Sequence, residues 1–188
     1  MDPFEQATHA LKHALKSEVV PALEGAVYTD KHRVFEAASP QRARIANAIS
    51  AQVAKLASDR ARPITVLSVG CGDGALDLAI LDKAGSDIEL FCGLDANADQ
   101  ISAFAARAHG RANVELIVGD RLASLHPRRF DLVYAIHLIY YVGDVGGFLD
   151  SLAQVAMPGG QIIVAVAPKS PMNVIADLFW REQGTEAL

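Results

Sequence analysis

The hydrophobic and polar positions follow a helical period before about residue 60 and a strand–helix alternation after it. Apolar residues recur at helical spacing between residues 4 and 19, and again along one face of residues 41–57. Residues 60–63 break this pattern. We therefore predict a helical segment at residues 1–58, acting as a lid or substrate segment, and a core at residues 59–188 within a single domain.

Five short apolar runs after the break are typical of strands, and helical segments separate them. The runs are almost continuously hydrophobic, as expected for strands that helices cover on both faces. We expect strands at 64–69, 88–94, 114–118, 130–136 and 161–167, helices at 75–84, 98–108 and 145–155, and a tight turn at 157–160. This alternation predicts an α/β fold, a doubly wound (Rossmann-like) parallel sheet of about five strands.

Glycines follow the first predicted strand at Gly70, Gly72 and Gly74, and a predicted helix starts directly after them. Glycine lets the backbone turn sharply and approach a ligand closely. The helix amino terminus adds free N–H groups and the positive end of the helix dipole. Gly70, Gly72 and Ala75 also satisfy the dinucleotide fingerprint, so this turn alone leaves the nucleoside cofactor open.

Carboxylates follow the next two strands. Asp95 closes the second strand, 21 residues after Gly74, and Asp120 follows the third. The carboxylate of Asp95 can accept hydrogen bonds from both hydroxyls of a ribose. The carboxylate of Asp120 can accept one from the exocyclic amine of adenine. The alternative is that both acids only cap the following helices.

Composition excludes several classes of protein. The chain has 188 residues and a net charge of −5, so we expect no broad basic surface and no nucleic-acid partner. It has no apolar run of 18 residues and no signal peptide, which predicts a cytoplasmic protein without membrane contact. Cys71 and Cys92 lack metal-ligand spacing, His9 and His13 lack a third ligand, and we expect no metal.

These motifs resemble the class I S-adenosylmethionine (SAM)-dependent methyltransferases over residues 60–168. The resemblance rests on residues 66–74, 93–95, 130–137 and 158–161. Many members of that family carry an acid where this chain has Ser68. The resemblance implies SAM as methyl donor, S-adenosylhomocysteine as product, and cofactor binding by Gly70, Cys71, Gly72, Gly74, Asp95, Ala96, Asp120, Arg121, Ile136 and His137.

Residues 67–70, 74–78, 136–142 and 178–181 are also similar to histamine N-methyltransferases. That similarity implies that Gln100 joins Asp95 at the ribose and that His137 and Tyr140 act at the acceptor as catalytic residues. It further implies an acceptor pocket lined by Tyr140, Tyr141 and Trp180, which could form an aromatic cage. Tyr28, Phe35 and Glu36 could form a lid on the substrate side, where Glu36 could pair with an amine. The alternatives are a histidine that only bonds backbone, aromatics that belong to the core, and a solvated loop around Glu36.

The leading functional prediction is SAM-dependent methyl transfer to a small-molecule acceptor, most simply an amine. Such a reaction needs alignment of donor and acceptor in a dry pocket, without a metal or covalent nucleophile. Two rival hypotheses are a non-catalytic SAM-binding subunit and an NAD-dependent oxidoreductase. Calorimetry with SAM, S-adenosylhomocysteine and NAD separates the cofactors.

The resemblance also implies two further antiparallel strands after the fifth, as a hairpin. We do not identify them in the 21 residues that follow Ala167, so the hairpin is apparently missing. The fifth strand would then be an uncovered apolar edge. A shortened chain, a homo-oligomer or completion by a partner chain would each account for this, and we predict an oligomer.

Overall fold

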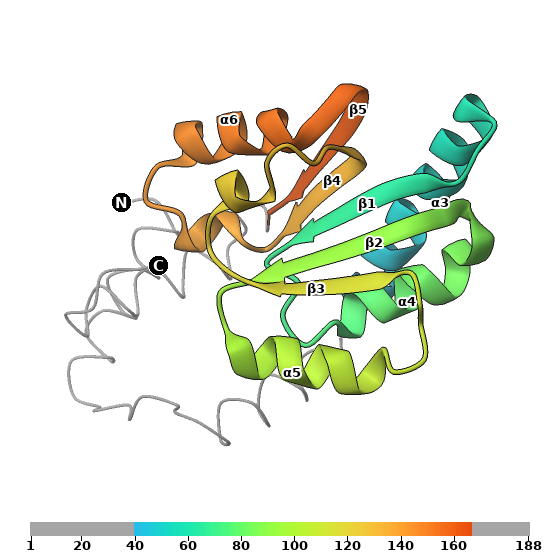
Figure 1. Ribbon diagram of the computed structural model, residues 1–188, viewed down its shortest axis with the longest axis horizontal. Helices are drawn as coiled ribbons and strands as arrows, with labels where there is room; N and C mark the ends of the chain where they lie inside the picture. Colours follow the sequence, from blue (N-terminus) through green and yellow to red (C-terminus); the bar gives the residue numbers. More distant parts are fainter. Residues whose placement is uncertain (1–39, 167–188) are drawn as a thin grey trace, which may run out of the picture. The chain divides into compact units, whose positions relative to one another are not determined.

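A computed structural model describes residues 40–166, and their elements alternate between strand and helix as predicted (Figure 1). In chain order they are α3 (Gln41–Arg60), β1 (Ile64–Val69), α4 (Ala75–Ala84), β2 (Ile88–Asp95), α5 (Ala98–Arg107), β3 (Val114–Val118), β4 (Phe130–Ile136), α6 (Val145–Val155) and β5 (Ala156–Ala165). Short 3-10 turns lie at Gly85–Asp87, Leu122–Leu125 and Ile139–Tyr141.

The five strands form one sheet in the order β3-β2-β1-β4-β5, and every pairing is parallel. This confirms the doubly wound α/β prediction. The chain winds outward from β1 to β3 and then crosses back to β4, so the strand order reverses between β1 and β4. Ligands of such sheets bind at the carboxyl ends of the strands beside this reversal.

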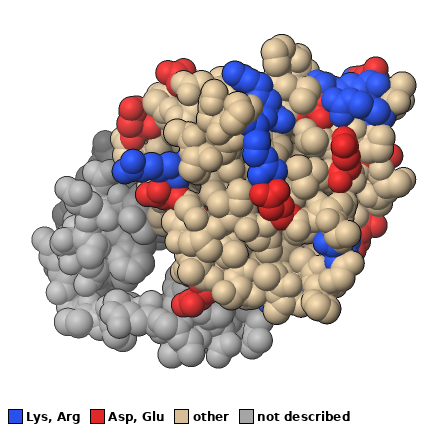
Figure 2. Space-filling model, viewed as in Figure 1, with Lys and Arg blue, Asp and Glu red and all other residues tan. Residues whose placement is uncertain are grey.

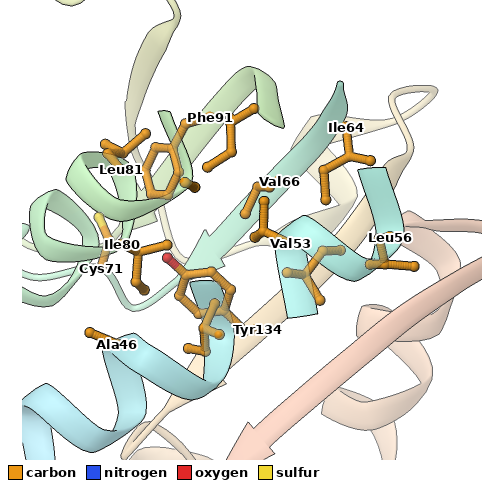
Figure 3. Close-up of a cluster of buried hydrophobic side chains, with 14 of the residues drawn as sticks. Ala46, Val53, Leu56, Ile64, Val66, Cys71, Ile80, Leu81, Phe91 and Tyr134 are labelled. Atoms are coloured by element: carbon orange, nitrogen blue, oxygen red, sulfur yellow. The ribbon is translucent and has the colours of Figure 1, made fainter. Parts of the chain in front are cut away.

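Helices cover both faces of the sheet, which explains the nearly continuous apolar strands. In Figure 1, α3, α4 and α5 lie on one face and α6 on the other. One buried cluster joins α3, α4 and α5 to the sheet, with Phe104 contributed by α5. Figure 3 shows Val53, Ile80 and Tyr134 of this cluster. A second cluster under α6 includes Leu67, Val133, Leu152 and Val155.

The predicted start of the fifth strand is wrong. β5 begins at Ala156, and the residues expected to form a tight turn before it lie inside the strand. Its register with β4 shifts between Phe130 and Leu132, which marks a bulge. Gly159 has a φ of +73°, a backbone conformation that glycine tolerates and a bulge requires. Residues 157–160 therefore form an irregular insertion within β5, opposite Asp131 alone, and the continuous pairing with β4 begins at Gln161.

The amino-terminal edge of the sheet is fastened by the buried carboxylate of Asp131 at the start of β4. It accepts hydrogen bonds from Arg60, from Arg62 at 2.8 Å, and from the Thr65 backbone at 2.8 Å. Burial alone would raise the pKa of Asp131, but the bonds from Arg62 and Thr65 and the charge of Arg60 together lower it. This cluster joins the end of α3 to β1 and β4, at the edge opposite the glycine turn.

Other sequence predictions concern the boundaries and surface of this unit. The boundary predicted between residues 58 and 59 falls inside α3, which packs on the same sheet.

β5 is an edge strand of the described sheet; Ile162 in this strand is 40% exposed, and Val166 directly after it is 47% exposed. Pairing of this edge with another chain stays a prediction. The visible face carries acidic and basic side chains interspersed (Figure 2), and none of the helices within residues 40–166 could span a membrane.

Candidate cofactor and acceptor site

The glycine turn after β1 has a positive φ at each of its three glycines: +71° at Gly70, +55° at Gly72 and +72° at Gly74. The backbone N–H groups of Gly70 and Cys71 donate to the carbonyl of Leu94 at 2.8 and 3.2 Å. These bonds fasten the turn to the carboxyl end of β2. Residues other than glycine rarely adopt such angles, so the local sequence dictates the shape of the turn.

The three glycines face different surroundings. A Cβ on Gly74 would lie 2.2 Å from the Phe104 ring, and a Cβ on Gly70 would lie 2.8 Å from the Leu138 side chain. These two glycines permit close packing. Among the residues that the structure describes, a Cβ on Gly72 would meet only the Gln100 side-chain oxygen, at 3.9 Å. Within this part of the chain, Gly72 therefore opens onto free space beside Gln100, where a ligand can approach the backbone.

Asp95 at the end of β2 is bonded directly to this turn. Its Oδ2 accepts a hydrogen bond from the Gly72 N–H at 2.8 Å, and its Oδ1 accepts one from the Asn97 N–H at 2.9 Å. Asn97, and not Asp95, caps α5 through its own side chain. Each carboxylate oxygen keeps a second acceptor position, so Asp95 can still bind the two hydroxyls of a ribose.

The other residues predicted to bind the cofactor also lie at the carboxyl ends of the strands, and they differ in how buried they are. Ile136 is half-buried at the end of β4. Three other residues are exposed at the carboxyl ends of β2 and β3, namely Ala96, Asp120 and Arg121. The 3-10 turn that starts at Leu122 has no side-chain cap, so Asp120 does not cap it. These residues are available to a ligand at the carboxyl edge, and their roles stay predictions.

The side chain of Cys71 points away from the open side of the turn. It lies in the buried cluster of Figure 3, and burial raises the pKa of its thiol. The thiol is therefore neutral and packs against β2, with its sulfur 3.1 Å from where a Cβ on Gly93 would be. Only the backbone of Cys71 can contribute to a ligand site.

Two charged residues at this turn were missed in the sequence. Arg107 at the end of α5 forms an ion pair with Asp73 of the turn at 2.6 Å. Asp77 in the first turn of α4 is completely buried and accepts a hydrogen bond from the Tyr134 hydroxyl. Burial raises the pKa of Asp77 to about 6, although the bonds from Tyr134 and Ser68 oppose this rise. The helical position of Asp77 predicts a first-turn charge, but gives no sign of its burial.

His137 lies just after β4 with a φ of +55°, which is uncommon for a residue other than glycine. Its N–H donates to the Ala165 carbonyl at 2.9 Å. The Gln41 amide nitrogen lies 3.0 Å from His137 Nε2, and the Tyr140 ring stacks on the imidazole with centroids 6.2 Å apart. Strained backbone at the carboxyl edge of a sheet is typical of functional sites.

A cavity of about 420 Å³ lies beside this histidine. Its lining combines the start of α3 with the end of β5, and the described residues that line it are Pro40, Gln41, Arg44, Ile45, His137, Ala165 and Val166. The cavity is large enough for a small organic molecule and has both polar and apolar walls.

Two members of the predicted aromatic cage lie in the described part of the chain. Tyr141 is 66% exposed, while Tyr140 is 37% exposed and stacks on His137. The third member, Trp180, lies outside the described residues, as do the predicted lid residues Tyr28, Phe35 and Glu36 and the two histidines His9 and His13. The cage and the lid stay predictions.

The fold and the turn define an α/β protein that binds a nucleoside cofactor at the carboxyl edge of its sheet. Residues 41–185 match the family described as "Methyltransferase domain". The chain therefore belongs to the class I SAM-dependent methyltransferase family. SAM is the cofactor of this family, and the open side of Gly72 with the free acceptor positions of Asp95 fits its nucleoside half.

Individual relatives differ in the acceptor atom, oxygen or nitrogen, that their names give for methylation. The chain is 27% identical to a ubiquinone biosynthesis O-methyltransferase of Hydrogenovibrio crunogenus, over 63% of this chain and 49% of the relative. It is 30% identical to phosphoethanolamine N-methyltransferase 1 of Zea mays, over 56% of this chain and 21% of that one. The chain thus spans half or less of the length of these two relatives.

A solved structure supports the fold. The N-methyltransferase NodS of Bradyrhizobium japonicum in complex with S-adenosylhomocysteine matches with a TM-score of 0.53 and 19% identity. The match covers 75% of this chain and 67% of that chain. At this identity the likeness is evidence for the fold alone.

Proposed function

We propose that this protein transfers the methyl group of SAM to a small molecule bound in the cavity beside His137. The observation that carries the proposal is the bond between Gly72 and Asp95, which joins the turn to a ribose-binding carboxylate at 2.8 Å. When bound, SAM supplies an electrophilic methyl group on a positively charged sulfur. The protein has to align the acceptor with that methyl group and exclude water.

The chain's own residues divide this work between two halves of the carboxyl edge. Gly72, Asp95 and Gln100 bind the nucleoside half of the donor. His137 and Tyr140 face the acceptor. The Gln41 amide donates to His137 Nε2 and orients the imidazole, which leaves the ring hydrogen on Nδ1. Nε2 can take the proton that the methylated acceptor loses once the Gln41 amide moves away from it. The cavity lies directly beside this histidine, which supports an acceptor role for His137 rather than a purely backbone one.

The first candidate acceptor is an amine, as the similarity to histamine N-methyltransferases implies, and a phenol is the second. Relatives named as O- and as N-methyltransferases support both classes. Arg44 adds a positive charge to one wall of the cavity, and Ile45 and Val166 add apolar surface. Acceptors with an apolar ring and a carboxylate or phosphate group therefore belong in the test panel.

Calorimetry with SAM, S-adenosylhomocysteine and NAD tests the cofactor half of the proposal. We expect binding of the first two and no binding of NAD. Incubation with methyl-labelled SAM and a panel of amines and phenols then tests transfer. SAM binding without transfer to any acceptor would favour the alternative of a non-catalytic or partner-completed subunit. Size-exclusion light scattering of the same sample tests the predicted oligomer, and a clean monomer would contradict it.

A further inference from the structure

Asp77 is a buried carboxylate directly behind the glycine turn. It is the third residue of α4 and is 1% exposed. The Tyr134 hydroxyl donates a hydrogen bond to Asp77 Oδ1, and the Ser68 hydroxyl lies within hydrogen-bonding reach of both. Ser68 on β1 and Tyr134 on β4 are partners in the parallel register. The carboxylate therefore ties the first turn of α4 to the two strands between which the strand order reverses.

No cation neutralises Asp77 among residues 40–166. Asp131, the other buried carboxylate, has ion pairs with two arginines, whereas Asp77 has none. The charged group that influences it from the turn is Asp73, which is also acidic, and the neighbouring Cys71 thiol is neutral. The helices α3 and α5 add uncharged side chains to the same cluster, among them Ala46, Ile49 and Phe104. An unpaired buried carboxylate is unfavourable, so a cationic ligand at the turn would relieve this cost.

We propose that Asp77 is a positioning residue for the methyl donor. Its carboxylate, held by Tyr134 and Ser68, fixes the first turn of α4 and supplies the negative charge behind the glycine turn. The inference rests on the proposed function, because SAM is the cationic ligand, with positive charge on its sulfur and its α-amino group. Because the Ser68 side chain contacts this carboxylate, an acid at position 68 on β1 would place its charge in the same buried cluster.

Calorimetry of SAM binding at pH 7.5 tests the inference with four variants. Asp77→Asn keeps the shape and removes the charge, and we expect SAM affinity to fall about tenfold. Asp82→Asn is the matched control, because Asp82 lies on the same helix with its side chain 63% exposed. The SAM affinity of this variant should stay within about twofold of that of the unmodified protein. Asp77→Ser should weaken binding as Asp77→Asn does. The double variant S68D/D77S, which moves the carboxylate from α4 to β1 within the same cluster, should recover most of the affinity.

Thermal unfolding of the same variants separates positioning from folding. The melting temperature of Asp77→Asn should not fall, because a neutral amide avoids burying a charge. An Asp77→Asn protein that binds SAM within twofold of the unmodified protein would overturn the inference. Failure of the unmodified protein to bind SAM would instead refute the proposed function.

A pH series on the unmodified protein tests the same inference without a substitution that could impair folding. The raised pKa, about 6, means that Asp77 gains a proton as the pH falls from 7.5 to 5.5. SAM affinity should therefore decrease over this range, and Asp77→Asn should show a flatter profile. If SAM affinity falls as steeply with pH in Asp77→Asn as in the unmodified protein, another group causes the pH dependence and the inference is overturned. An affinity of the unmodified protein that does not change with pH would also overturn it.

Discussion

The backbone N–H of Gly72 donates a hydrogen bond of 2.8 Å to the carboxylate of Asp95. This bond joins the end of β2 to the turn after β1. The glycine and the acid, 23 positions apart in the chain, therefore form one binding unit. Because Asp95 also accepts from Asn97, its orientation is set before any ligand arrives.

Replacement of Asp95 by alanine should therefore weaken SAM binding strongly. The variant loses the acceptor for the ribose hydroxyls and the anchor of the glycine turn together. Hydrogen bonds to charged groups contribute about 1.5–3 kcal/mol, so we expect a fall of about 10–100-fold in SAM affinity by calorimetry. Asp99→Asn, an exposed acid in the first turn of α5, is the control and should bind SAM normally. Equal affinities for both variants would remove Asp95 from the site.

Replacement of Gly72 by alanine should reduce ligand affinity more than stability. The new methyl group would occupy the open space beside Gln100, because no other side chain or distant backbone atom of residues 40–166 lies within 4 Å of its position. Gly110→Ala is a matched control, since Gly110 also has a positive φ, +85°, and an added Cβ there would meet no such atom of the described residues within 4 Å. Both substitutions should cost about 1 kcal/mol of backbone strain in the free energy of unfolding. Only Gly72→Ala should lower SAM affinity, and an equal loss in Gly110→Ala would point to a global effect of strain.

Much of this arrangement follows from the sequence, because parallel strands bring their carboxyl ends to one edge. The β1 and β4 ranges, the glycine turn and the position of Asp95 were predicted from apolar runs and their ends. The bulge at Gly159 was not predicted, because a Pro-Gly-Gly stretch is typical of a turn as well.

The buried partners of the turn were missed for a different reason. Asp77 and Arg107 lie at helical positions where charged residues are usually solvated, and their partners Tyr134 and Asp73 are 57 and 34 positions away. Only the packing of α4 and α5 on the sheet brings these pairs together. Single-sequence patterns report periodicity, and these contacts depend on tertiary structure.

Replacement of His137 by asparagine should separate catalysis from cofactor binding. Asparagine tolerates the positive φ at this position, so the backbone of the carboxyl edge should be preserved. If the imidazole takes a proton from the acceptor, the rate of methyl transfer should fall about 100-fold or more. SAM affinity should change by no more than about threefold, measured by calorimetry on the same protein. If the variant transfers methyl groups to the best acceptor of the panel at an unchanged rate, His137 has only a structural role, through its contacts with Gln41 and the backbone of Ala165.

Replacement of Asp131 by asparagine should destabilise the fold without affecting the site. The substitution removes the carboxylate shared by Arg60 and Arg62, whose side chains are partly exposed, so the loss is that of hydrogen bonds to a charged group, about 1.5–3 kcal/mol. The pKa of Asp131 is lower in the folded protein than in the unfolded chain, so its contribution is complete above the unfolded value, about 4. That contribution is lost as the pH falls through the lower, folded value. Urea unfolding at pH 7 and at pH 3 should therefore show a difference between the two proteins that shrinks in acid. SAM affinity should stay the same at pH 7, because this cluster lies at the opposite edge of the sheet, and a large loss of affinity would contradict that separation.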